Sequence, residues 1–339
     1  MRSCFRLCLG LRLGKVFKSE AGSYFLGMAI WEFEPLPQER IWGGRNLAER
    51  FGRKLPEEKK IGETWELVDR PEAQSKETES GKTLHDWWSG PEREKIFGTK
   101  APATERFPIL IKLLDAQDKL SLQVHPPAEK ARELHGEPKT EMWFFLETQP
   151  EAEILVGLKS GVGKVEFEKA LAAGTLANCF HRVRTEPGAA MFLPSGRVHA
   201  IGAGNVILEI QQNSDTTYRV YDWDRKDDAG KPRALHVKEA LASIRWDDHE
   251  PAFVQPRGER LLICDHFKIT RWWLAPGELR EMVPNPKSFR YLFVAAGKIQ
   301  EKESGREWSK GAARFVTADH ASLLLEGVED ATVVQAEFS

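Results

Sequence analysis

The sequence has 339 residues, of which 41% are hydrophobic and 29% are charged, and no long apolar stretch interrupts it. This composition is typical of a globular protein and excludes a fibrous, collagen-like or wholly disordered chain. The 49 Lys and Arg residues nearly balance the 51 Asp and Glu residues, so no general attraction to nucleic acid or an anionic membrane is indicated. We therefore expect a small molecule as the partner, with neither nucleic acid nor membrane, and the oligomeric state stays open.

The length and the cysteines narrow the expected organisation. A chain of 339 residues exceeds what one hydrophobic core usually serves, which favours two domains. The four cysteines form no CxxC pair, so neither a disulfide framework nor a cysteine-based zinc knuckle is indicated. A reducing cytoplasmic location fits this pattern best.

The first 27 residues differ from the rest of the sequence. They are rich in Arg and contain no acidic residue before Glu20. They lack both the unbroken apolar run of a signal peptide and the roughly 20 apolar residues of a membrane span. An Arg-rich transit peptide is one alternative, but we expect that translation begins at Met28 and that residues 1–27 are not part of the fold.

From Trp31 onward, short apolar stretches alternate with Gly, Pro and Asn, which predicts the strands of a sandwich or barrel. The charged stretch Arg53–Lys82 is expected to be exposed. The strands expected next are Phe107–Leu114, Leu120–His125, Met142–Leu146, Glu153–Leu158, Ala189–Leu193 and Val206–Gln211. Helical patterns are fewer and cover roughly 128–135, 165–173 and 235–245. The sequence shows no βαβ alternation and no glycine-rich phosphate loop, which argues against a nucleotide-binding α/β fold.

A boundary near Asp247–Gly258 precedes a second strand-rich part of the chain. The strands expected there are Leu261–Cys264, Phe267–Leu274, Phe289–Ala295, Ala313–Thr317, Ala321–Leu325 and Ala331–Phe338. A short internal echo links the two parts, since Gly188-Ala-Ala-Met-Phe-Leu is similar to Gly311-Ala-Ala-Arg-Phe-Val. The echo suggests two related β-units, with chance similarity as the alternative.

Side chains that bind metals recur in three neighbouring segments. Gln123 and His125 lie two residues apart and therefore share one face of a strand, as do Lys139 and Glu141. A third segment carries His199 behind a Pro-x-Gly turn. Two imidazoles, a carboxylate and an amide oxygen from adjacent strands make a mononuclear metal site with room for water or substrate. A single histidine is more often structural, but the spacing of this set favours the metal site.

The segment 188–199 resembles a known motif. Its pattern G-x5-P-x-G-x2-H is similar to the second cupin motif, in which the turn delivers a metal-binding histidine into a β-barrel. The resemblance implies an all-β fold.

Four motifs in order resemble the signature of the type I phosphomannose isomerases. They are Gln123-Val-His125-Pro126, Lys139-Thr-Glu141-Met-Trp143, Pro194-Ser-Gly-Arg-Val-His199 and Glu209-Ile-Gln-Gln-Asn-Ser214-Asp215-Thr-Thr-Tyr-Arg219. The stretch Ile41-Trp42-Gly43-Gly44 is similar to the opening of that family. The similarity runs in order from about Trp42 to Trp223 and continues more weakly beyond. The chain past Met28 has the length of the shorter bacterial form.

This resemblance implies a zinc-dependent aldose–ketose isomerase of carbohydrate metabolism, which interconverts mannose 6-phosphate and fructose 6-phosphate. It also implies a cupin (jelly-roll) catalytic barrel with small helical insertions over 28–250, and a second, metal-free cupin-like β-domain over 251–339. One zinc ion per chain would be held by Gln123, His125, Glu141 and His199. The ligand types alone also suit non-haem Fe(II).

The implied reaction needs a base on one face of a cis-enediol and a positive group that holds oxyanion charge. The family positions make Arg219 the expected charge-stabilising residue. They leave the proton-carrying base open among Lys139, Glu209 and Asp215. A lysine would need a lowered pKa for this role, and a carboxylate a raised one.

The implied substrate phosphate needs cations, because the sequence has no glycine-rich loop to hold it. Arg219, Lys112 and Ser121 are the expected contacts, with a solvated surface charge as the alternative for Lys112. Trp42 is either a sugar-stacking residue or an ordinary core aromatic, and the 11 tryptophans favour the core.

Two other functions are the alternatives. A cupin-type metal-dependent oxygenase would use the same histidines and carboxylate, but Gln123 takes a coordination position that oxygen activation needs open. A non-catalytic sugar-phosphate-binding paralogue would keep the fold without turnover, and the intact set of metal ligands with Arg219 argues against it. The sequence does not distinguish free from phosphorylated sugar.

Overall fold

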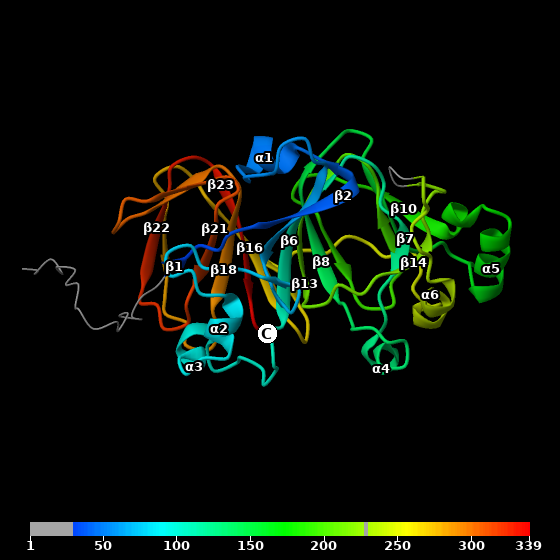
Figure 1. Ribbon diagram of the computed structural model, residues 1–339. Coiled ribbons are helices and arrows are strands. Elements are labelled where there is room, and N and C mark those ends of the chain that lie inside the picture. Colours follow the sequence, from blue (N-terminus) through cyan, green and yellow to red (C-terminus); the bar gives the residue numbers. More distant parts are fainter. Residues whose placement is uncertain (1–29, 227–229) are drawn as a thin grey trace, which may run out of the picture.

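The computed structural model describes residues 30–226 and 230–339, and strands dominate this part of the chain (Figure 1). The expectations about residues 1–27 and about a start at Met28 fall outside the described residues. Among the described helices, none has the length and apolar character needed to cross a membrane.

The first half of the chain forms two antiparallel sheets. The larger has the order β11-β8-β13-β6-β3-β2, and its strands are β2 (Leu36–Gly44), β3 (Ile61–Leu67), β6 (Ile109–Ala116), β8 (Glu141–Thr148), β11 (Ala190–Leu193) and β13 (Asn205–Gln212). The smaller has the order β10-β9-β12-β7-β14, and its strands are β7 (Leu122–Val124), β9 (Glu153–Leu158), β10 (Phe180–Arg184), β12 (His199–Ile201) and β14 (Tyr218–Tyr221). One apolar cluster joins the two sheets into a barrel, since it contains Phe145 and Ile207 from the larger sheet and Val156 and Ile201 from the smaller.

The second half repeats this plan. Its larger sheet has the order β1-β21-β18-β23-β16-β15, with β1 (Ile30–Trp31), β15 (Arg260–Ile263), β16 (Lys268–Leu274), β18 (Arg290–Ala296), β21 (Ala313–Val316) and β23 (Ala331–Glu337). Its smaller sheet has the order β17-β22-β19-β20, with β17 (Leu279–Met282), β19 (Lys298–Glu301), β20 (Glu307–Ser309) and β22 (Leu323–Gly327).

The strand orders of the two halves correspond element by element. The run β11-β8-β13-β6-β3 matches β21-β18-β23-β16-β15, and β10-β9-β12-β7 matches β20-β19-β22-β17. The glycines that open the sequence echo, Gly188 and Gly311, both have positive φ, +84° and +88°, directly before β11 and β21. The expected all-β fold of two cupin barrels is therefore confirmed. We propose the boundary between residues 250 and 251, with β1 as a strand that crosses to pair with β21.

The helices are short and lie outside the barrels. They are α1 (Asn46–Phe51), α2 (Leu84–Trp88), α3 (Arg93–Phe97), α4 (Ala128–Ala131), α5 (Lys164–Ala172) and α6 (Val237–Ser243), with a 3-10 turn at Leu176–Cys179 and a two-stranded ribbon of β4 (Asp69–Arg70) and β5 (Ala73–Gln74). α4 and α6 fall within the expected helical stretches, and α5 begins one residue before the stretch expected there. α5 ends shortly before Gly174, whose φ of +70° suits only glycine at low cost.

The strand β3 corrects one expectation. The charged stretch Arg53–Lys82 was expected to be exposed, but every residue of β3 is buried. Its charges are tolerated because they are paired: Glu66 Oε2 lies 2.7 Å from Arg53 Nη2, and Glu63 also has cationic partners. The expectation of exposure was therefore wrong because it rested on the number of charged residues alone. The aromatic and β-branched residues of β3 are typical of a strand.

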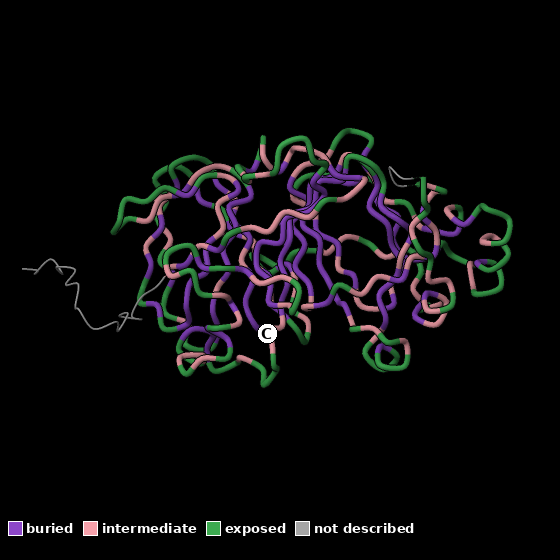
Figure 2. The backbone as a smooth tube through the Cα atoms, in the orientation of Figure 1, coloured by how far each residue is buried: buried purple, intermediate pink, exposed green. Residues whose placement is uncertain are grey.

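The two larger sheets pack face to face at the centre of the molecule. Residues from one face of the first sheet, such as Ile111, Phe144 and Leu208, share an apolar cluster with Phe293 and Val334 of the second sheet. Figure 2 shows the buried strands concentrated in this central region. Since side chains alternate along a strand, the opposite faces of these strands point into the two barrels.

We expect Phe289→Ala to destabilise the fold strongly, because this side chain is fully buried and stacks on Phe315 with ring centroids 4.8 Å apart. Deleting a buried phenyl ring costs about 3–5 kcal/mol of unfolding free energy. Urea unfolding followed by tryptophan fluorescence measures this loss. Val165→Ala on α5, where the side chain is exposed, is the control and should change the free energy by less than about 0.5 kcal/mol. Equal effects of the two variants would contradict the assigned core.

Candidate metal centre and adjoining cavity

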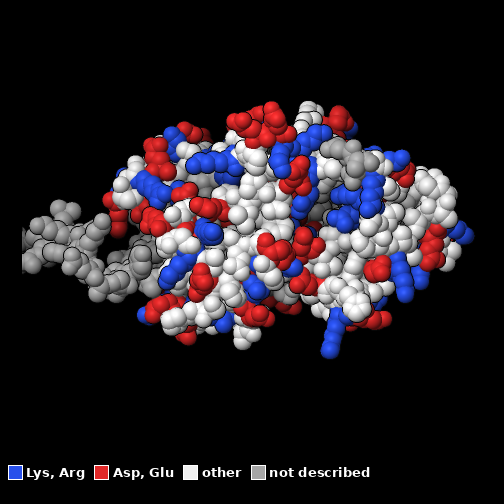
Figure 3. All heavy atoms as spheres, viewed as in Figure 1, with Lys and Arg blue, Asp and Glu red and all other residues white. Residues whose placement is uncertain are grey.

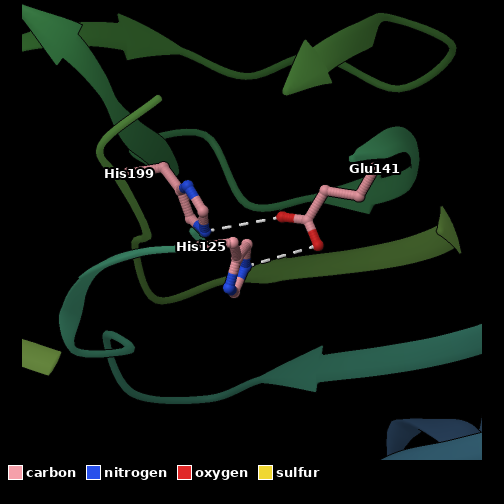
Figure 4. Close-up of side chains that lie close together, drawn as sticks. All are labelled: His125, Glu141 and His199. Atoms are coloured by element: carbon pink, nitrogen blue, oxygen red, sulfur yellow. Dashed lines mark ion pairs between the residues drawn. The ribbon is translucent and has the colours of Figure 1, made fainter. Parts of the chain in front are cut away.

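Three side chains converge at one end of the first barrel (Figure 4). His125 directly follows β7, Glu141 opens β8 and His199 opens β12, and all three are buried. Glu141 Oε1 lies 3.4 Å from His199 Nε2, and Glu141 Oε2 lies 3.6 Å from His125 Nε2. The three ligand atoms lie within 4.8 Å of one another, which is compact enough for all of them to bind one metal ion.

A hydrogen bond at Nδ1 of each imidazole fixes the tautomer of the ring. His125 Nδ1 lies 2.7 Å from the Thr216 carbonyl oxygen, and His199 Nδ1 lies 2.9 Å from the Arg197 carbonyl oxygen. A carbonyl oxygen only accepts hydrogen bonds, so both Nδ1 atoms carry the proton and both Nε2 lone pairs face Glu141. Among the described residues, His125 Nε2 has no hydrogen-bond partner, so its buried lone pair is unpaired. Unpaired buried lone pairs of this kind suit a metal ion.

The charge states also suit a metal ion. Burial lowers the pKa of His125 to about 3 and also lowers the pKa of His199, so both rings are neutral near pH 7. Burial would raise the pKa of Glu141, but Lys139 and His125 outweigh it and hold that pKa well below its usual value. The group is therefore two neutral imidazoles and one carboxylate anion, the protonation state that metal binding requires.

The turn before β12 brings His199 to His125. The Gly196 amide donates to the His125 carbonyl oxygen at 2.9 Å, which ties the turn to the end of β7. Gly196 has a φ of +89°, and a Cβ there would lie 2.6 Å from Arg245 Cγ and 3.0 Å from the Ser243 carbonyl oxygen. Only glycine fits this position without strain, so the Pro-x-Gly spacing has a direct physical cause.

Gln123 lies at the edge of the same group. It is paired in register with His199 across β7 and β12. Its Nε2 lies 3.3 Å from His199 Nε2, and its Oε1 accepts a hydrogen bond from Ser121 Oγ at 3.1 Å. The amide is therefore close enough to join the histidines and the carboxylate around one ion.

A cavity of about 350 Å³ opens beside this group, between the two sheets of the first barrel. Figure 3 shows a hollow in this region with Lys and Arg side chains beside it. Of the residues expected from the sequence, the cavity brings together Trp42, Lys112, Ser121, Gln123, Lys139, Glu209, Asp215 and Arg219. It also includes three charged residues that the sequence did not reveal, namely Arg40, Glu63 and Arg233.

A row of side chains crosses four strands of the larger sheet along one wall. Trp65, Lys112, Glu209 and Trp143 are partners in register on β3, β6, β13 and β8. Trp143 Nε1 donates to Glu209 Oε2 at 2.8 Å, and Lys112 Nζ lies 3.6 Å from Glu209 Oε1. Burial raises the pKa of Glu209, although Lys139 opposes the shift. The sheet therefore presents to the cavity a carboxylate with an increased affinity for a proton.

Lys139 connects this row to the candidate metal-binding group of His125, Glu141 and His199. Its Nζ lies 2.9 Å from Glu141 Oε2 and 3.8 Å from Glu209 Oε1. Burial lowers the pKa of Lys139, but Glu141 and Glu209 outweigh it, and the net effect is a raised pKa. Lys139 is thus a buried ammonium between two carboxylates.

The opposite wall carries a pair of arginines. Arg219 is the register partner of Gln123 on the neighbouring strand β14, and its buried Nε has no hydrogen-bond partner among the described residues. Burial lowers the pKa of Arg219, and the positive charge of Arg233 lowers it further. Arg233 Nε donates to Asp222 at 2.7 Å. Asp215 is exposed on the same wall.

Two further expected residues are part of the wall itself. Trp42 is buried in the cluster that holds the barrel together and also borders the cavity, so it is both a core residue and a lining residue. Lys112 is almost fully buried between Glu63 and Glu209, whose carboxylates lie 3.7 Å and 3.6 Å from its Nζ.

The three cavity residues that the sequence analysis did not predict differ in whether any sequence pattern indicates them. Glu63 lies in β3, where a strand assignment would have placed it on the same face as Trp65. Arg40 pairs with it across β2 and β3, 3.1 Å between Nε and Oε1, which is a contact over 23 positions of the chain. Arg233 lies in irregular chain before α6, and no local pattern marks it.

Comparisons with known proteins agree with this geometry. A sequence profile of the catalytic domain of type I phosphomannose isomerase matches residues 30–158. The mannose-6-phosphate isomerase ManA of Bacillus subtilis (strain 168) is 38% identical over 314 residues, which cover 89% of this chain and 97% of that protein. The mannose-6-phosphate isomerase of Streptococcus mutans is 34% identical over 270 residues, which cover 77% of this chain and 84% of that protein.

A solved structure extends the agreement to the fold. The crystal structure of mannose 6-phosphate isomerase from Bacillus subtilis superposes with a TM-score of 0.80 at 30% identity, over 91% of this chain and 99% of that one. The similarity covers both barrels and the segment that carries the buried His, Glu and His group. This chain is therefore a member of the type I phosphomannose isomerase family.

Proposed function

We propose that this chain interconverts mannose 6-phosphate and fructose 6-phosphate, an aldose–ketose isomerisation. The observation that carries the proposal is the buried group of His125, Glu141 and His199 beside a cavity that also contains the Glu209 carboxylate. The names of the similar proteins supply mannose 6-phosphate, and the family resemblance implies fructose 6-phosphate as its partner in the interconversion. The comparisons give no support to an oxygenase or to a non-catalytic paralogue.

We propose that the metal is one Zn²⁺ ion per chain, with Gln123 as a fourth ligand beside His125, Glu141 and His199. A half-turn of the Gln123 amide would bring Oε1 to the side of His199 and would let Nε2 donate to Ser121 Oγ, with which the amide already forms a hydrogen bond. Bound zinc supplies a Lewis acid that polarises the sugar oxygens. A neutral amide ligand leaves more of the positive charge for that task than a second carboxylate would.

Glu209 is the proposed carrier of the proton between C2 of the aldose and C1 of the ketose. A base for this task works best when its pKa is shifted towards neutral pH, and burial shifts the pKa of Glu209 in that direction. The Trp143 indole holds Oε2, which leaves Oε1 for the substrate. Lys139, whose ammonium lies between Glu141 and Glu209, is placed to stabilise negative charge on the enediol oxygens.

Arg219 and Arg233 are the proposed phosphate contacts. Two guanidinium groups on one wall repel each other, and an anion between them relieves that repulsion. The other expected contacts already have partners in the wall: Lys112 lies between two carboxylates, and Ser121 is hydrogen-bonded to Gln123. The proposed location is the cytoplasm, because the described cysteines, Cys179 and Cys264, are free thiols.

Zinc content tests the metal site. We expect purified wild-type protein to contain about one zinc per chain and His199→Ala to retain less than a tenth of it, because loss of one of four ligands lowers affinity by orders of magnitude. Elemental analysis after dialysis measures both. His249→Ala, at an exposed histidine outside the group, is the control and should keep its zinc. Full zinc occupancy in His199→Ala, or one equivalent of iron in place of zinc, would contradict the assignment.

A coupled isomerase assay tests the function and the base together. Wild-type protein should convert mannose 6-phosphate, and Glu209→Gln should lower kcat by about 10²–10⁴-fold because the amide cannot accept the proton. Zinc content and unfolding midpoint should change little. Glu168→Gln, on the exposed face of α5, is the matched control. Absence of isomerisation by metal-replete wild type would overturn the function, and wild-type kcat in Glu209→Gln would overturn the base.

A substrate panel tests the phosphate contacts. For Arg219→Ala we expect KM for mannose 6-phosphate to rise by about tenfold or more, since a charge-assisted contact to phosphate contributes about 1.5–3 kcal/mol. The kcat/KM for unphosphorylated mannose should stay near the wild-type value. Equal losses with both sugars would show that Arg219 acts at the reacting carbons instead.

A further inference from the structure

Glu63 is a buried carboxylate at the cavity wall, and its described ion pairs and hydrogen bonds include none of the proposed metal ligands. Its Oε1 lies 3.1 Å from Arg40 Nε, and its Oε2 accepts a hydrogen bond from Trp65 Nε1 at 2.7 Å. The same Oε2 lies 3.7 Å from Lys112 Nζ. Three separate strands therefore supply partners to one carboxylate.

Lys112 links Glu63 to Glu209. Its ammonium lies 3.7 Å from Glu63 Oε2 and 3.6 Å from Glu209 Oε1, with 4% of the side chain exposed. The ring of Trp65 lies beneath it, 5.1 Å from Nζ to the centroid. These two carboxylates are the only ion-pair partners of Lys112 among the described residues. The single positive charge is therefore shared between them.

The two carboxylates differ in their response to the shared charge. Burial raises the pKa of Glu63, but Lys112, Arg40 and the Trp65 hydrogen bond outweigh it and lower that pKa to about 2. Glu63 is therefore an anion at every working pH. The net shift of Glu209 has the opposite sign, since burial raises its pKa and the negative charge of Glu63 adds to the increase.

The groups that face Glu209 come from all the strands packed against it. They are Lys112 on β6, Trp143 and Glu141 on β8, Lys139 just before β8, and Glu63 on β3. Of the two anions in this set, Glu141 belongs to the proposed metal site. Glu63 is the one that balances a cation without contacting any proposed metal ligand.

We propose that Glu63 is a positioning residue of the isomerase, which shares the Lys112 ammonium with Glu209 and so keeps Glu209 available as a proton acceptor. The inference rests on the role proposed for Glu209. Without the Glu63 charge, Lys112 would pair with Glu209 alone and stabilise its anion, which would make it a weaker base. Arg40 contacts Glu63 at the partly exposed end of the row and adds a second cation. Positive and negative side chains therefore alternate along the row.

The test is Glu63→Gln in the zinc-bound protein. The amide keeps the shape of the side chain and can still accept the Trp65 hydrogen bond, but it removes the negative charge. In the pH profile of kcat, the acidic limb should move to lower pH by about one unit, because a Glu209 with a lower pKa stays ionised at lower pH. The plateau of kcat should fall by about threefold to tenfold, since a weaker base takes up the proton less readily.

A second readout does not depend on turnover. The protonated carboxyl group of Glu209 has a C=O stretching band in the infrared spectrum, which is assigned by its absence from the spectrum of Glu209→Gln. The intensity of this band as a function of pH gives the ionisation midpoint of Glu209 directly. That midpoint should also move to lower pH in Glu63→Gln. A midpoint equal to that of the wild type would overturn the proposal. An inactive wild-type protein would instead count against the proposed function, while the infrared titration would still decide the role of Glu63.

Two variants separate this role from a merely structural one. Glu66→Gln removes a carboxylate from the same strand, where it is buried and paired with Arg53 on the opposite face of β3. It should lower stability and leave both the kcat profile and the infrared midpoint unchanged. Glu63→Asp keeps the charge and should restore the wild-type acidic limb. Equal shifts in Glu63→Gln and Glu66→Gln would overturn the proposal.

Discussion

The central strands of the first barrel are buried on both faces, and this burial determines where their charged side chains point. One face of β6, β8 and β13 packs on the larger sheet of the second barrel, and the other face lines the cavity. Because side chains alternate along a strand, Lys112 and Glu209 must point into the barrel when Ile111 and Leu208 point out of it. The packing between the barrels therefore fixes the charged row in place, and a shift of register by one residue would bury these charges in the apolar interface.

The second barrel supports the first but carries different side chains at the equivalent positions. In the first barrel, three residues in register across adjacent strands face the cavity: Lys112, Glu209 and Trp143. The equivalent row of the second barrel is Thr270, Gln335 and Leu292. Its interior is filled by apolar side chains, with Trp272 and Trp308 among the largest. The same strand order thus accompanies the proposed reaction centre in one barrel and a packed core in the other.

Local patterns in the sequence predicted the strands of a sandwich or barrel and the proximity of His125, Glu141 and His199, while the family resemblance supplied the two cupin barrels. Strand alternation placed Gln123 with His125, and the Pro-x-Gly spacing placed His199, as the positive φ of Gly196 explains. Glu63 was not predicted as a cavity residue, because its charge indicated an exposed position. The partners that permit its burial lie 23 and 49 positions away on other strands. Pairings between distant segments carry no signal in a single sequence, and Arg233 was missed for the same reason.

In the proposed reaction, this barrel moves a proton between two sugar carbons through a cavity carboxylate, next to the proposed metal site. Proton transfer through a side chain exchanges with solvent, whereas a direct hydride shift between the carbons does not. The most direct measurement is proton NMR of mannose 6-phosphate during turnover in D₂O. If the reaction proceeds by this proton transfer, deuterium enters at C2 of the recovered substrate and at C1 of the product. Complete retention of the original hydrogen through many turnovers would contradict it.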